Sequence, residues 1–177
     1  MSLPVDILVN EHKLILRAVD SMKRENEKIQ TNQTTNPNFI TTVVDFFRTY
    51  ADRFHHGKEE GVLFKELSQK ELNEDDQKVM SELIQEHAFA RRTVTALEDA
   101  KERYVAGNNE VLKDVLDLLA ALIKLYPAHI EKEDKHFFYP CMEYFSEAER
   151  HNMMASFLFF NQNFIDKRYK QIIDSLQ

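Results

Sequence analysis

Two segments of the chain repeat one arrangement of side chains, a histidine followed four residues later by a glutamate. The first segment contains His56 and Glu60, and the second contains His129 and Glu133. On an α-helix, side chains at this spacing lie on the same face, one turn apart. An imidazole nitrogen and a carboxylate oxygen placed in this way can bind the same transition-metal ion. Each segment therefore predicts part of a metal site.

Two further histidines, His12 and His87, stand in stretches whose apolar residues recur at helical spacing. A single histidine on an apolar face is more often a hydrogen-bonded core residue than a ligand. The repetition argues against that interpretation, because four helices each place a histidine on an apolar face. Two of them add a carboxylate, whose burial would require a cation. The predicted metal ligands are His12, His56, Glu60, His87, His129 and Glu133.

The adjacent histidines offer a second pair at the same spacing, His55 with Glu59. With a rotation of about 100° per residue, His55 points about 180° away from the apolar face of its helix, whereas His56 and Glu60 point closer to that face. We therefore place His55 and Glu59 on the polar side of the helix. Together with His136, they are second choices as ligands.

Long helices must position these residues. The 177 residues include only 3 Gly and 4 Pro, so the residues that form turns are scarce. Amphipathic patterns fill the chain between short polar breaks near residues 31–38, 68–76, 106–109 and 145–147. The sequence therefore predicts one all-α domain.

A fifth amphipathic segment, at about residues 146–175, follows the four that carry the histidines. Ser146 is suited to capping its N-terminus, and Phe157, Phe160 and Phe164 follow. We expect this aromatic C-terminal helix to act as a lid, or as an interface with a protein partner or a second copy of the chain.

Composition limits the classes of partner. A net charge of −7 provides no basic surface of the kind that binds nucleic acid or anionic lipid. The N-terminal region has no long apolar stretch for secretion or membrane insertion, and the single Cys141 cannot form an internal disulfide. We therefore expect a cytoplasmic protein that binds neither nucleic acid nor a membrane.

The order of the motifs, His, His-x-x-x-Glu, His, His-x-x-x-Glu with one block per helix, resembles the hemerythrin-like (HHE cation-binding) domain family. The matching stretches, within about residues 5–145, include Asn10–His12, Glu59–Phe64, Gln85–His87 and Glu133–Pro140. The resemblance implies an antiparallel up-down-up-down four-helix bundle around two oxo- or hydroxo-bridged iron ions, for which Zn or Mn could substitute. It also implies that the six predicted residues are the ligands, with the two glutamates as bridges.

One position departs from the oxygen-carrying hemerythrins. Those proteins have a second histidine one turn after the third-helix ligand, and this chain has Arg91 there. Four histidines, two bridging carboxylates and a bridging oxygen would fill about ten of the roughly twelve positions around two octahedral ions. His136 or a tyrosine could fill one of the two positions left. The extra vacancy favours binding of water, an anion or a reactive small molecule over dedicated storage of O2.

The main functional prediction is a protein that binds O2, NO or another small ligand or anion at a di-iron centre. One alternative is a di-iron enzyme that reduces peroxide, NO or O2, with Tyr50, Tyr126 or Tyr139 as a proton donor. Ferroxidase chemistry is less favoured, because the Glu-x-x-His pattern occurs once, at Glu133 and His136. A zinc site would need only three or four of these ligands. If the bundle were instead a structural module in which the histidines only pack, its stability would not depend on metal.

Overall fold

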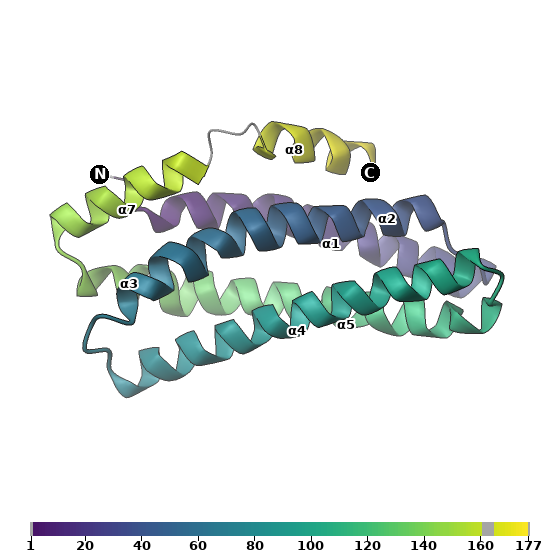
Figure 1. Cartoon of the computed structure of the whole chain (residues 1–177), viewed down its shortest axis with the longest axis horizontal. Coiled ribbons are helices and arrows are strands. Elements are labelled where there is room, and N and C mark those ends of the chain that lie inside the picture. The colour runs from purple at the N-terminus through teal and green to yellow at the C-terminus, as the bar shows by residue number, and fades with distance from the viewer. Residues whose placement is uncertain (1, 161–164, 177) are drawn as a thin grey trace.

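The computed structural model describes residues 2–160 and 165–176, and within these ranges the chain is helical and contains no β-strand. The predicted all-α class is therefore confirmed. Figure 1 shows the long helices lying lengthwise along the molecule, with α7 and α8 on one side. The order of up and down helices that the family resemblance implies stays a prediction.

The helices that carry the predicted ligands include three π-helical segments, η1, η2 and η4. In chain order these elements are α1 (Val5–Asn32), α2 (Pro37–Phe46), η1 (Phe47–His56), η2 (Glu59–Phe64), α3 (Lys65–Leu67), α4 (Glu74–Val105), α5 (Leu112–Lys132), η4 (Glu133–Phe137) and α6 (Phe138–Cys141). Short 3₁₀ turns precede α5 and follow α6, at η3 (Asn109–Val111) and η5 (Met142–Tyr144). All four predicted polar breaks fall between helices.

Asparagine side chains begin three of these elements. Asn36 accepts a hydrogen bond from a backbone N–H at the start of α2, Asn73 does so at α4 and Asn108 at η3. Such caps satisfy N–H groups that the first turn of a helix leaves without a partner. The asparagines in the polar breaks thus cap the starts of α2, α4 and η3.

The apolar core consists of two clusters, and the histidines lie where the clusters meet. On α1, His12 lies between Leu8 of the smaller cluster and Ile15 of the larger one. On α4, His87 lies in the same way between Leu83 and Ala90. A polar layer therefore crosses the bundle between two apolar regions.

The predicted C-terminal helix corresponds to two helices, α7 (Glu147–Phe160) and α8 (Ile165–Ser175), while residues 161–164, including Phe164, lie outside the described residues. The α7 residue Phe157 is fully buried in the smaller cluster. Tyr169 of α8 donates a hydrogen bond to Asp45 (2.9 Å). Both helices therefore pack on the bundle, whereas Phe159 is 70% exposed. A role of this region as an interface stays a prediction.

Candidate metal centre

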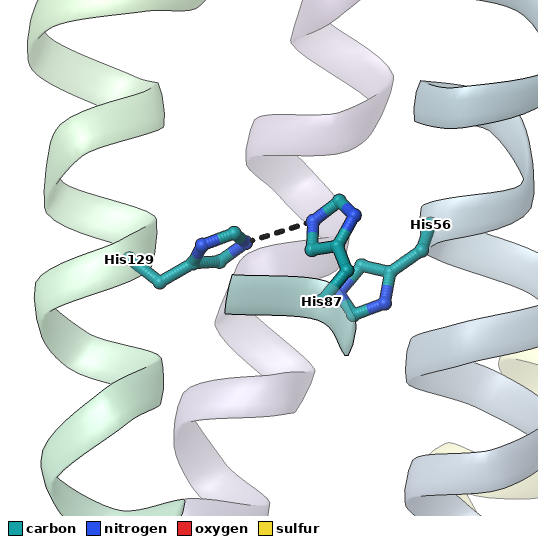
Figure 2. A group of neighbouring side chains, drawn as sticks. All are labelled: His56, His87 and His129. Atoms are coloured by element: carbon teal, nitrogen blue, oxygen red, sulfur yellow. Dashed lines mark hydrogen bonds between the residues drawn. The ribbon is translucent and has the colours of Figure 1, made fainter. Parts of the chain in front are cut away.

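Seven buried side chains converge in the polar layer, in two neighbouring groups. Within each group, one potential ligand atom per residue lies within 4.8 Å of the others. The first group is His12, His55, Glu59 and Glu133, and the second is His56, His87 and His129. Figure 2 shows the three imidazoles of the second group, which come from three different helices and point toward one another. The seven residues together are called the histidine layer below.

Glu59 contacts histidines of both groups. Its Oε1 atom lies 3.0 Å from Nε2 of His55, and its Oε2 atom lies 3.3 Å from Nε2 of His87. Two ligand atoms bound to one ion at right angles, each at about 2.1 Å, are about 3 Å apart. The separations around Glu59 are therefore suitable for ligands that share an ion.

Glu133 repeats this arrangement from the opposite side of the layer. Its Oε2 atom lies 3.2 Å from Nε2 of His12, and its Oε1 atom lies 3.3 Å from Nε2 of His129. Each glutamate therefore joins one histidine of the first group to one histidine of the second.

The carboxylates of Glu59 and Glu133 are fully buried, and none of their four oxygens has a hydrogen-bond partner within the described part of the chain. A buried carboxylate without a compensating partner costs several kcal/mol. A cation between the two glutamates would remove this cost. The side chains present therefore fit metal ions.

Charges within the layer shift the histidine pKa values in opposite directions. Burial lowers the pKa of His55, but Glu59 and Glu11 together outweigh burial and raise it to about 10. Burial also lowers the pKa of His129, but Glu133, with smaller contributions from Glu86 and Glu59, raises it to about 10. Burial and neighbouring imidazoles hold the pKa of His56 well below its usual value. In the metal-free protein, protons on imidazoles balance the two carboxylates, and metal binding would displace those protons.

The structure departs from the α-helical phase expected around His55. The prediction that His55 and Glu59 lie on the polar side is wrong, because their exposed fractions are only 1% and 0%. A π-helix places more residues in each turn than an α-helix, so each residue turns through a smaller angle and the expected phase is lost. At the end of η1, His55 meets His12 (Nε2 to Nε2, 2.9 Å) while His56 stacks on His87.

Two sequence-predicted candidates lie outside the histidine layer. The Glu60 side chain is 32% exposed, and its Oε1 atom accepts a hydrogen bond from Nδ1 of His87 (2.7 Å). His136 is exposed on η4. The structure therefore brings together five of the six first-choice residues and two of the second choices, His55 and Glu59.

Most imidazoles in the layer contact a second carboxylate through the nitrogen that faces away from the centre. These Nδ1 contacts are His12 with Asp134 (2.8 Å), His55 with Glu11 (2.9 Å), His87 with Glu60 (2.7 Å) and His129 with Glu86 (2.7 Å). Such partners orient the ring and direct its other nitrogen toward a metal. These outer carboxylates in turn contact cations, for example Glu11 with the buried Lys58 (2.5 Å) and Glu86 with Lys132 (2.7 Å).

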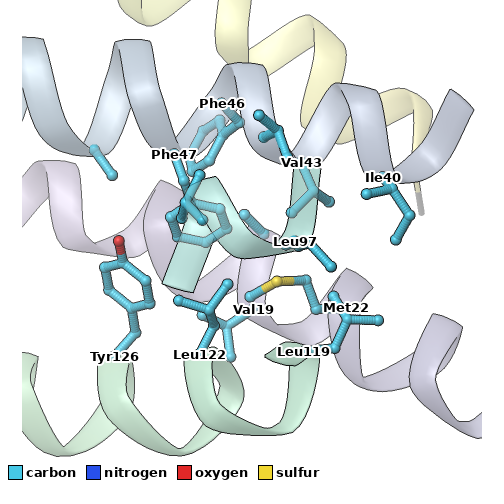
Figure 3. Packing of buried hydrophobic residues seen from close by; sticks show 14 of the residues in the cluster. Val19, Met22, Ile40, Val43, Phe46, Phe47, Leu97, Leu119, Leu122 and Tyr126 are labelled. Carbon is cyan, nitrogen blue, oxygen red and sulfur yellow. The ribbon is translucent and has the colours of Figure 1, made fainter. Parts of the chain in front are cut away.

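Of the three tyrosines predicted as alternative proton donors, Tyr126 and Tyr50 are buried, whereas Tyr139 is 42% exposed. Tyr126 lies on α5 one turn before His129 and packs against Phe47, with ring centroids 4.6 Å apart (Figure 3). Burial raises the pKa of Tyr126. Its phenol therefore keeps its proton beside the histidine layer.

The fold and site define a helical protein with a buried layer of histidines and carboxylates suited to cations. The family model of the hemerythrin HHE cation-binding domain matches residues 3–141, and the chain belongs to this family. Neither the curated proteins nor the solved structures contain a match to the chain. Among the described residues, no helix has the length and apolar character needed to span a membrane.

Proposed function

We propose that the histidine layer holds two iron ions and that the protein binds a small ligand, such as O2, NO or an anion, at this di-iron centre. His12 and His55 would hold one ion, and a second ion would be held by His56, His87 and His129. Glu59 and Glu133 would bridge the two ions within a four-helix bundle. The observation that carries the proposal is the pair of buried carboxylates, each about 3 Å from a histidine of both groups.

The residues in the layer change the expected number of open positions. Five histidines and two bridging carboxylates would supply about nine of the roughly twelve positions around two octahedral ions, and a bridging oxygen about two more. His56 would take the place of the ligand that Arg91 cannot provide. The group around His12 and His55 has one histidine fewer than the group around His56, His87 and His129. We therefore expect the small ligand to bind at the ion that His12 and His55 would hold.

The protein surrounds this centre with apolar side chains. Phe138 stacks on His12 and Phe64 stacks on His87, with ring centroids 5.7 and 6.1 Å apart. Bound iron would supply redox and Lewis-acid chemistry. The chain's own residues would orient the imidazoles and keep bulk water away from the site.

The second candidate function is an enzyme that reduces peroxide, NO or O2. Tyr126 supports it, because its protonated phenol is buried one turn from His129. A donor of this kind could deliver a proton to a reduced ligand. The two functions would be distinguished by whether the bound ligand is released unchanged or consumed in repeated turnovers.

Elemental analysis of protein prepared without chelator, with absorption spectra before and after exposure to air, tests the proposal. We expect about two irons per chain and a charge-transfer band of an oxygen-bridged iron pair. Two zinc or manganese ions would show a dinuclear site with a different metal. Protein that binds a single zinc ion, or no metal when supplied with iron, would contradict the proposal.

A further inference from the structure

Arg91 of α4 connects η1 and η2, the π-helical segments that carry His55, His56 and Glu59. Its Nε atom donates a hydrogen bond to Asp52 of η1 (2.7 Å), and its Nη2 atom donates one to Glu60 of η2 (2.8 Å). The planar guanidinium group suits such a double contact, since it presents several N–H groups in a fixed fork.

Both carboxylates held by Arg91 contact imidazoles of the same group. Glu60 Oε1 accepts hydrogen bonds from Arg91 and from Nδ1 of His87. Asp52 lies 3.5 Å from Nδ1 of His56. One guanidinium group therefore supports the outer nitrogens of two of the three histidines that surround one proposed ion. By contrast, Lys58 and Lys132 each reach the carboxylate of one histidine.

The contact with Arg91 is better suited to positioning than to stabilising the fold. The Arg91 side chain is 40% exposed, and exposed ion pairs contribute little to stability. Both carboxylates lie within 2.8 Å of the same Arg91 nitrogen, so without the guanidinium they would repel each other.

We propose that Arg91 is a positioning residue for the ion held by His56, His87 and His129, and that it acts by holding Asp52 and Glu60 against the outer nitrogens of two of these histidines. The inference rests on the proposed di-iron function. Carboxylates that contact the outer nitrogen of a ligating histidine fix the ring and raise its basicity. Arg91 would thereby tune one ion of the pair and leave the ion held by His12 and His55 unchanged.

The test compares Arg91→Gln and Arg91→Lys with the matched control Arg48→Gln. Arg48 lines the same surface depression as Arg91 and has nearly the same exposure (39%), but it pairs with Glu98, which is not part of the histidine layer. Each full-length protein is loaded with ferrous iron, and the release of iron to a competing chelator and the Mössbauer spectrum are measured. Melting of the metal-free variants verifies that they fold alike.

We expect Arg91→Gln to weaken the binding of one iron ion about 10–100-fold, the usual effect of losing an outer contact of a ligating histidine, and to change one of the two Mössbauer signals. Arg91→Lys should recover part of the affinity, and Arg48→Gln should behave as the unmodified protein does. Unchanged affinity and spectrum in Arg91→Gln, or equal weakening of both ions, would overturn the inference. Failure of the unmodified protein to bind iron would instead refute the proposed function itself.

Discussion

Replacing Glu59 and Glu60 by glutamine, one at a time, tests which of the two adjacent carboxylates belongs to the metal centre. The chemical change is the same at both positions. Glu59 is fully buried, with its two oxygens close to histidines of both groups, whereas His87 is the one histidine of the layer that Glu60 contacts, at its outer nitrogen. The two variants should therefore differ strongly in iron binding.

The magnitude follows from distance and from the number of ions affected. An imidazole ring separates Glu60 from the proposed ion, so its carboxylate would stand about three times as far away as a ligand atom, and its Coulomb attraction would be about one third as large. Glu60 would also act on one ion, whereas Glu59 would act on two. Its electrostatic contribution should therefore be roughly one sixth of that of Glu59.

Iron content and iron affinity of the two variants provide the assay. We expect Glu59→Gln to reduce iron from about two ions per chain to fewer than one, since each ion loses a ligand. Glu60→Gln should keep about two ions, with one bound about 10–100-fold more weakly. The reverse pattern, in which Glu60→Gln loses iron and Glu59→Gln retains it, would show that the α-helical phase of this segment is correct and refute the reasoning from π-helical geometry.

Three further predictions concern the histidines and the core. His55→Ala and His56→Ala should each lower iron from about two ions to about one per chain, because the two residues belong to different groups; full iron content in either variant argues against that residue as a ligand. In metal-free protein, His55 and His129 have a raised pKa and therefore contribute to the free energy of unfolding. This contribution is complete below pH 6.5 and is lost as the pH rises through about 10. The free energy of unfolding should therefore fall between about pH 7 and pH 10, and it should fall less in iron-loaded protein. Denaturant titrations of both forms would measure this difference, and an equal fall in both forms would contradict the prediction. Phe157→Ala should cost about 3–5 kcal/mol and lower the melting temperature by about 10 °C, because the side chain is fully buried in the smaller cluster. Iron content should stay unchanged, because Phe157 is not one of the seven residues of the histidine layer; loss of iron in folded protein would instead tie α7 to the site.

The helical architecture could be predicted because its causes are local. Scarce glycine and proline, apolar residues at helical spacing and polar breaks with capping asparagines determine where helices form. The same periodicity placed His12, His87, His129 and Glu133 on the inward faces of their helices, where the structure has them.

The register around residues 47–64 could not be predicted in the same way. A constant angle per residue holds only along an α-helix, whereas η1 and η2 are π-helical, and this feature has no clear mark in the residue types. The doublets His55-His56 and Glu59-Glu60 do not distinguish the two registers, because both registers offer a histidine and a glutamate four residues apart. The adjacent pairs were the available signal that both histidines could face inward, each toward a different group.

The position of the histidine layer between the two apolar clusters has a consequence for how the protein unfolds. On α1 and α4 the apolar stripe is interrupted at His12 and His87. On these helices, polar side chains therefore separate the two clusters. Cooperativity between the two halves then depends on what joins those side chains, and regions with weak coupling open separately in hydrogen exchange. With ions bound, ligands from four segments of the chain become one rigid connection. Iron supply would thereby decide whether the two ends of the bundle exchange their amide hydrogens independently or as a single unit.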